Sequence, residues 1–186
     1  NLEAAMNGDP QVLDAIQNVL TAELKAINQY FLHAEMCENW GLAKLAMHMK
    51  KDSSEEMKHA EKCMERMLFL DGSPNMTKEM VIAIGGSVPD MFKNDLQLEY
   101  EAVAHLNKII DVAAKAGDNG TRDLFLAILK DEEEHVEFIE TQCAKAGIPR
   151  PVSFCCPGYA TSEAAAKLLD EFKAVLTATQ TGSWRW

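Results

Sequence analysis

The sequence lacks the long apolar run that a membrane-spanning helix requires. About 20 consecutive apolar residues are needed to cross a bilayer, and no stretch of this chain approaches that length. Residues 1–10 show neither a basic segment nor an apolar one, so no signal peptide is visible. Met6 fits a natural start, which leaves residues 1–5 either as an added stretch or as the stump of a removed leader. We therefore expect no membrane partner.

An excess of positive charge is also missing. Lysines and arginines number 18 against 29 aspartates and glutamates, which gives a formal net charge of -11. Nucleic-acid binding needs basic patches that neutralise phosphates, so we expect no nucleic-acid partner. Hydrophobic residues make up 47% of the chain and charged residues 25%, which indicates an ordinary globular domain with a buried core.

Paired cysteine motifs are absent as well. The five cysteines include no Cys-x-x-Cys pair, and an odd set of this kind indicates reduced thiols in a cytoplasmic protein. Cys155 and Cys156 are adjacent in a proline-rich segment. We interpret them as free thiols, with a metal-binding or subunit-bridging role as the alternative.

The chain is instead rich in helical periodicity. Apolar residues recur at helical spacing over four long segments, which span residues 11–39, 42–70, 89–116 and 121–147. The other segments are interpreted as a crossover, a linker, a short fifth helix and a tail, at residues 71–88, 148–159, 162–178 and 179–186. Two tight hairpins joined by one long crossover predict an all-α four-helix bundle with a short fifth C-terminal helix.

Residue types at the expected helix starts support these boundaries. Asp9 followed by Pro10 is typical of the start of the first helix. Ser87, with Asp90 three positions later, resembles a capping box for the third helix. Thr121 is expected to cap the fourth helix.

Six polar residues interrupt the apolar faces of the four predicted helices. They are Glu23, Glu56, His59, Glu99, Glu132 and His135. The second and fourth helices each carry a Glu-x-x-His, whose two side chains share one face. Each motif begins 33 residues after a glutamate on the preceding helix, so the chain contains two copies of one unit.

The positions of the turns bring these six residues to one level. The first hairpin turns near Trp40, midway between Glu23 and Glu56, so a rise of about 1.5 Å per residue places both glutamates at nearly the same height. The second hairpin turns near Asp118, somewhat off the midpoint of the corresponding pair, an offset that turn geometry can absorb. Four carboxylates and two imidazoles would then converge inside the bundle.

Such a cluster predicts a site for two metal ions. Burying an unpaired carboxylate costs several kcal/mol, and two divalent cations would cancel the combined charge. Carboxylates with imidazoles suit iron or manganese and could accept zinc or cobalt, and the lack of cysteine argues against structural zinc. Surface charges at chance spacing are the alternative. In the acidic run at residues 131–134, helical spacing from His135 selects Glu132, and the same rule rejects Glu55.

Over residues 6–147 the sequence resembles the bacterioferritins. The resemblance is carried by ELKAINQYFLHAEMCENWGL, EEMKHAE and LKDEEEHVEFIET. It implies a ferritin-like bundle over residues 1–147, with residues 148–186 in the same domain, and a hollow homo-oligomer of 24 subunits that stores iron. It also implies ferroxidase activity, in which dioxygen or hydrogen peroxide oxidises Fe(II) before Fe(III) enters the cavity as mineral, and a ferredoxin-type reductant for release.

Carried over residue by residue, the resemblance assigns ligands for two iron ions per subunit. Glu23 and His59 would hold the first ion, and Glu99 and His135 would hold the second. Glu56 and Glu132 would bridge the two ions. Holding two ions at bridging distance favours their joint two-electron oxidation. Tyr30 lies two turns from Glu23 on the same face and is either an electron donor or a core tyrosine.

Haem b shared between two subunits is a further implication, with Met57 of each subunit as its axial ligand. Met57 is offset by about 100° from Glu56, so it faces away from the bundle core. Ala60 and Met64 continue this stripe, which suits a partner subunit.

Two departures from the family pattern bear on iron storage. Lys51 stands where family members often carry a histidine that faces the cavity, which leaves the route of iron into the cavity open. From Pro151 onward the chain differs in its cysteine pair, its longer fifth helix and its tail, which could change the pore, the assembly or a docking partner. The tail ends in Trp184, Arg185 and Trp186.

Three rival functions fit parts of the pattern. A rubrerythrin-like di-iron peroxidase without a storage role usually carries a rubredoxin-like module with Cys-x-x-Cys pairs, and none occurs here. A DNA-protecting mini-ferritin holds iron between subunits and often has basic tails, whereas all six candidate ligands here come from one bundle. A structural protein with a vestigial metal site would not be expected to keep six ligands intact.

Overall fold

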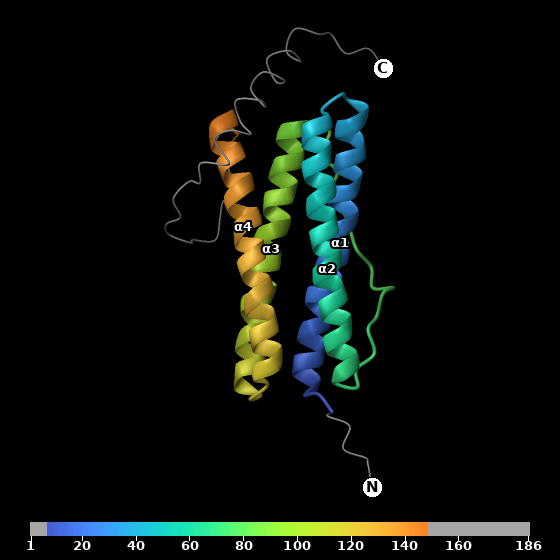
Figure 1. Cartoon of the computed structure of the whole chain (residues 1–186), viewed down its shortest axis with the longest axis vertical. Coiled ribbons are helices and arrows are strands. Elements are labelled where there is room, and N and C mark those ends of the chain that lie inside the picture. The colour runs from blue at the N-terminus through green and yellow to red at the C-terminus, as the bar shows by residue number, and fades with distance from the viewer. Residues whose placement is uncertain (1–6, 149–186) are drawn as a thin grey trace.

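Four long helices make up most of the computed structural model, which describes residues 7–148 (Figure 1). They are α1 (Pro10–Asn39), α2 (Ala43–Phe69), α3 (Val88–Lys115) and α4 (Asn119–Ala146). The described residues contain no strand, so the predicted all-α class is confirmed. None of the described helices has a stretch apolar and long enough to cross a bilayer. The predicted fifth helix, the tail, the adjacent cysteines and residues 1–5 lie outside the described residues.

The starts of α1 and α3 follow the predicted capping. The Asp9 carboxylate accepts a hydrogen bond from the backbone N–H of Gln11 at 2.7 Å, and Pro10 is the first residue of α1. The hydroxyl oxygen of Ser87 accepts a hydrogen bond from the N–H of Asp90. Each bond satisfies one of the amide groups that the first turn of a helix leaves unpaired.

The start of α4 differs from the prediction, because Asp118 caps the helix in place of Thr121. The Asp118 carboxylate accepts a hydrogen bond from the N–H of Thr121 at 3.0 Å. The Thr121 hydroxyl donates to the same carboxylate and is buried in the first turn. A carboxylate offers more acceptor positions than a hydroxyl, so Asp118 also accepts from Arg66 at 2.6 Å. This contact ties the end of α2 to the start of α4.

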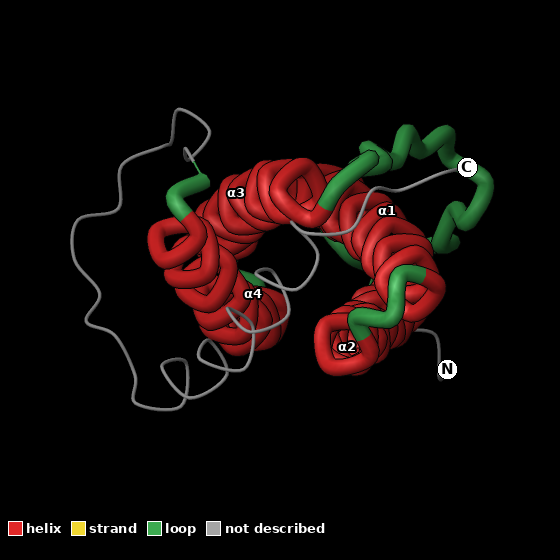
Figure 2. Tube along the Cα trace, turned by 90° about the horizontal axis from the view of Figure 1, so that it is seen from above, coloured by secondary structure: helices red, strands yellow, loops and turns green. Residues whose placement is uncertain are grey.

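The four helices form two antiparallel hairpins. Gly41 and Gly117, both with positive φ, lie in the turns between α1 and α2 and between α3 and α4. Helix α1 packs against α2 and α3, and α3 packs against α4. A cleft of about 320 Å³ lies between α2 and α4. In Figure 2 the traces of these two helices stand apart on one side of the bundle, which we call its open side. The predicted crossover between α2 and α3 runs along the outside of the bundle (Figure 1).

Three buried side chains fasten the crossover to the bundle. The side-chain oxygen of Gln29 accepts a hydrogen bond from the N–H of Ala83 at 2.9 Å, and His33 Nε2 accepts one from the N–H of Gly85 at 3.1 Å. Asp95 of α3 accepts from the Gln29 amide at 2.8 Å and lies 2.9 Å from His33 Nδ1. Because His33 Nε2 accepts an amide proton, the ring proton is assigned to Nδ1, facing Asp95. The network fixes the crossover, α1 and α3 relative to one another.

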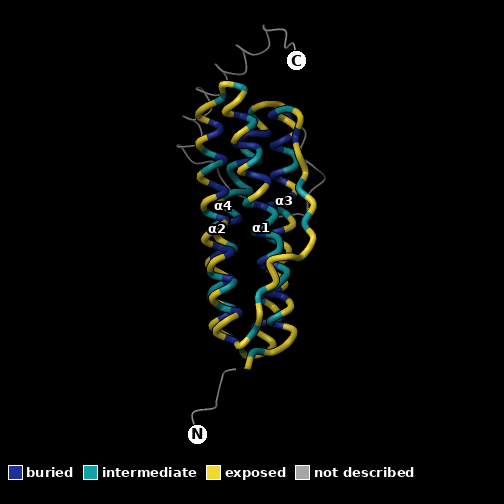
Figure 3. The backbone as a smooth tube through the Cα atoms, turned by 90° about the vertical axis from the view of Figure 1, so that its right-hand side faces the viewer, coloured by how far each residue is buried: buried dark blue, intermediate teal, exposed yellow. Residues whose placement is uncertain are grey.

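Apolar residues fill both ends of the bundle and leave a polar level between them. One cluster, around Leu45 and Met91, occupies the end near the turn from α1 to α2. The other, around Ile16, Leu106 and Phe125, occupies the opposite end. Figure 3 shows buried positions along the whole length of the bundle. Each large buried apolar side chain contributes about 1.5–3 kcal/mol, so the two clusters hold the helices together on both sides of the polar level.

Candidate metal centre

All six predicted residues meet at the polar level between the two apolar clusters. Five of the side chains are buried, and His135 is partly buried, with an exposed fraction of 13%. They form two overlapping groups whose candidate ligand atoms lie within 4.8 Å of one another. The groups are Glu23, Glu56, His59 and Glu132, and Glu56, Glu99, Glu132 and His135. Glu56 and Glu132 belong to both groups, and we call them the shared glutamates.

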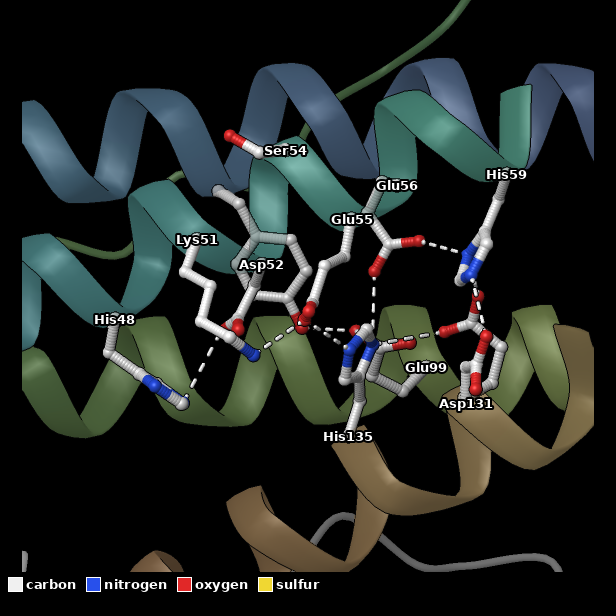
Figure 4. Close-up of polar contacts among 12 residues, drawn as sticks. His48, Lys51, Asp52, Ser54, Glu55, Glu56, His59, Glu99, Asp131 and His135 are labelled. Carbon is white, nitrogen blue, oxygen red and sulfur yellow. Dashed lines mark hydrogen bonds and ion pairs between the residues drawn. The ribbon is translucent and has the colours of Figure 1, made fainter. Parts of the chain in front are cut away.

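The two histidines aim the same ring nitrogen at the cluster (Figure 4). His59 Nδ1 lies 2.8 Å from Glu132 and 3.1 Å from Glu56. His135 Nδ1 lies 3.0 Å from Glu56 and 3.2 Å from Glu132. Each histidine therefore contacts both shared glutamates, one on its own helix and one across the space between α2 and α4. The Glu-x-x-His spacing creates the first contact, and the tertiary fold creates the second.

Burial and hydrogen bonding set the charges of the cluster. Burial raises the pKa of Glu23 and that of Glu99 well above the usual range, which favours their neutral forms. Burial would lower the pKa of His59, but hydrogen bonds to three glutamates raise it to about 12. The pKa of His135 is raised against burial in the same way, and hydrogen bonds from both histidines lower the pKa of Glu56 to about 2 although burial opposes this. Protons thus offset the negative charge, and incoming cations must displace them.

The cluster also holds most of the unpaired buried polar atoms of the described residues. Over the described residues, five buried side-chain nitrogen or oxygen atoms make no hydrogen bond. Four of them are carboxylate oxygens, on Glu23, Glu56, Glu99 and Glu132. The oxygens on Glu56 and Glu132 still lie within 3.0 Å of a histidine Nδ1, but outside hydrogen-bonding geometry. Buried acceptors without donors are costly, and divalent cations between these oxygens would pair all four, so the residues fit two hard or intermediate metal ions.

Tyr30 adds a hydrogen-bond donor to the centre. Its hydroxyl donates to Glu99 Oε1, and its side chain is buried. Burial, followed by the nearby carboxylates, raises the pKa of Tyr30 well above its usual value, so the phenol keeps its proton at neutral pH. Tyr30 also lines the cleft between α2 and α4. The contact with a candidate ligand is one that the sequence did not reveal.

Two acids that helical spacing rejected as ligands lie beside the centre. Asp131 Oδ2 is 3.3 Å from His59 Nε2, and Glu55 Oε2 is 3.5 Å from His135 Nε2. Neither belongs to the two overlapping groups, so the spacing rule does select the carboxylates that face the cluster. It carried no information about contacts to the far side of each imidazole.

A third group of candidate ligands lies at the cleft. It consists of Asp52, Glu55 and His135. Asp52 is buried, which raises its pKa to about 7, and its position one turn before Glu56 is a signal that could have found it. Lys51 lies in the same cleft and donates to Glu55 at 2.9 Å.

The expected outward stripe on α2 is only partly correct. Met57 is 58% exposed and faces away from the cluster. Ala60 is buried and Met64 is half-buried against an apolar cluster, so the expectation that they continue the exposed stripe is wrong. Ala60 lies one turn after Glu56 and therefore shares its inward face.

Comparisons with known proteins identify the family of this chain. Residues 13–147 match the ferritin-like domain family. A bacterioferritin from Mycolicibacterium paratuberculosis is 44% identical over 137 residues, which cover 74% of this chain and 86% of that protein. Bacterioferritins from Streptomyces coelicolor and Brucella melitensis are 44% and 38% identical over 137 residues, covering 74% of this chain and 82% and 85% of their own lengths. With all six clustered residues inside the matched region, the chain belongs to the bacterioferritin family.

Proposed function

We propose that this protein stores iron and acts as a ferroxidase, oxidising Fe(II) to Fe(III) at the buried centre and keeping the product inside a hollow homo-oligomer. The observation that carries the proposal is the pair of overlapping ligand groups with Glu56 and Glu132 in common. Shared carboxylates would hold two ions close enough for joint oxidation. A rubrerythrin-like peroxidase is not favoured, because the matched relatives are bacterioferritins.

The proposed chemistry transfers two electrons per pair of iron ions. With dioxygen as the oxidant, two electrons and two protons produce hydrogen peroxide; with hydrogen peroxide, they produce two water molecules. Glu23 and His59 would bind one ion, and Glu99 and His135 would bind the other. Glu56 and Glu132 would bridge the two ions. When Fe(II) binds, Glu23 and Glu99 would release the protons that burial makes them hold. The two histidines would release the protons that their hydrogen bonds to glutamates stabilise.

Haem, assembly and location complete the proposal. The thioether of Met57 would be a haem ligand between two subunits, and its exposure of 58% on the side of α2 away from the cluster supports this role. The shell would contain 24 subunits, and a ferredoxin-type protein would supply electrons for iron release. The buried thiols of Cys37 and Cys63 suit a reducing compartment, the cytoplasm.

Substitution of one shared glutamate tests the ferroxidase. Glu132→Ala should slow oxygen consumption with Fe(II) by at least about 10-fold, while the bundle stays folded because the apolar clusters on both sides of the centre still pack the helices together. Glu134→Ala is the matched control, since Glu134 is an exposed acid on the same helix. Equal oxidation rates in the two variants would show that the centre is misassigned. Light scattering on the same sample distinguishes a large hollow particle from a dimer. A dimer would argue against iron storage.

A further inference from the structure

Each candidate ligand histidine has an acid on its far ring nitrogen, and the acid comes from the opposite helix. Asp131 of α4 contacts Nε2 of His59 on α2, and Glu55 of α2 contacts Nε2 of His135 on α4. Figure 4 shows the two acids beside the two rings. Each acid directly precedes one of the shared glutamates in the sequence. The arrangement therefore occurs twice, in a crossed pattern between the two hairpins.

The acids face the nitrogen that a metal would leave free. A neutral imidazole carries one proton, and a metal binds the nitrogen without it. An acid at Nε2 holds the proton there and leaves the Nδ1 lone pair facing the shared glutamates. The acid also fixes the plane of the ring and makes the Nδ1 lone pair a stronger electron donor to the metal. The acids would act through the histidines, without touching the metal.

Lys51 makes the two halves of this pattern unequal. Its ammonium group lies 2.9 Å from Glu55 Oε2, the same oxygen that lies 3.5 Å from His135 Nε2. The lysine therefore competes with the ring for one acceptor and adds positive charge beside an incoming cation. Among the described residues, no lysine or arginine forms an ion pair with Asp131, whose contact to His59 is shorter at 3.3 Å.

We propose that Asp131 and Glu55 are positioning residues for the two ligand histidines, and that Lys51 makes the His135 position the weaker of the two metal positions. The proposal rests on the di-metal centre proposed above. It names residues that determine affinity at that centre without being ligands. Both acids are partly exposed, with side-chain exposure of 50% for Asp131 and 30% for Glu55, so their substitution should leave the fold intact.

Titration of the intact protein with cobalt(II) tests this inference. Cobalt(II) suits the same carboxylate and imidazole ligands, and its visible absorption reports each ion as it binds, independently of any oxidation of iron. The unsubstituted protein should bind two ions per subunit in two steps. Asp131→Ala should weaken the tighter step by about 10–100-fold and bring the steps together, whereas Glu55→Ala should weaken the other step and separate them further. Asp131→Asn, which keeps an acceptor, should recover part of the loss.

Matched controls separate positioning from charge alone. Glu134→Ala removes an acid that lines the same cleft, and Lys58→Met removes a lysine that lines it. Lys51→Met should tighten the weaker step, and Lys58→Met should not. If the protein binds two cobalt ions, and Asp131→Ala and Glu55→Ala bind them as tightly as Glu134→Ala does, this proposal is overturned. The proposed metal centre would still stand. Binding of no cobalt at all would overturn the centre itself, and this proposal with it.

Discussion

Glu132 on α4 lies 2.8 Å from the Nδ1 of His59 on α2, and this contact joins the two helices across the open side of the bundle. Apolar packing joins α1 to α2, α1 to α3 and α3 to α4, whereas a cleft separates α2 from α4 along part of their length. At one end, Arg66 bonded to Asp118 provides another link between them. The polar centre is thus both the candidate site of chemistry and part of what holds α2 against α4.

Stability without metal should therefore depend on pH. The folded state raises the pKa of His59 to about 12 and also raises the pKa values of His135, Glu23 and Glu99. Unfolded values are about 6.5 for histidine and about 4.3 for glutamate, so the folded chain binds these protons more tightly. Their stabilising effect is complete below the unfolded values and declines as pH rises through the folded ones. The melting temperature with a chelator should fall from pH 6 to pH 9.

A metal ion that stays divalent should weaken this dependence of the melting temperature on pH. Cobalt(II) would displace the same protons, so the loaded protein should melt higher, with a shallower decline across that pH range. The low pKa of Glu56, about 2, acts in the opposite direction but only at acid pH, outside this window. If the melting temperature of the protein in the presence of a chelator rose between pH 6 and pH 9, the protonation assigned to the two histidines, Glu23 and Glu99 would be contradicted.

Tyr30→Phe should act on one half of the centre. Loss of the hydroxyl leaves Glu99 Oε1 without its donor, and an unsatisfied buried acceptor costs about 1–3 kcal/mol. We expect a lower melting temperature and slower Fe(II) oxidation, measured by stopped-flow absorbance. Tyr100→Phe is the control, because Tyr100 donates to Glu140 at 2.6 Å outside the cluster. Similar rates for both variants would exclude a role for Tyr30 in oxidation.

His33→Ala should loosen the crossover. The substitution removes the acceptor of the Gly85 N–H and one donor to Asp95, which is buried. A buried polar group that loses its hydrogen-bond partner costs about 1–3 kcal/mol. Urea unfolding should show this loss, and hydrogen exchange at the Gly85 amide should become faster. Gln97→Ala, which removes only an exposed bond to Glu101, should change neither quantity.

Met57→Leu should test haem binding separately from the metal centre. Protein reconstituted with haem should show a Soret band that the variant loses, while cobalt binding stays unchanged. Met47→Leu is the control, because Met47 is another exposed methionine of α2, at 69% against 58% for Met57. Absence of the band from the unsubstituted protein would remove haem from the proposed function.

The sequence by itself determined the helices and the composition of the cluster. The starts of α1, α2 and α3 were expected within about one residue of their positions, because apolar periodicity and capping are properties of neighbouring residues. The cap of α4 was expected at Thr121, three residues after Asp118, the residue that caps it. The Glu-x-x-His motifs selected His59 and His135 with their own glutamates, because residues three apart share a helix face. The equal separations then placed Glu23 and Glu99 at the same level as these motifs.

Only the tertiary structure decided which residues meet from opposite helices. The crossed contacts of Asp131 and Glu55, and the hydroxyl of Tyr30 at Glu99, depend on how each helix is rotated and shifted against its neighbours. Helical spacing fixes angles within one helix and leaves that rotation undetermined. The packing of α1 against α2 and α3, and of α3 against α4, sets it, because these contacts involve residues far apart in the chain.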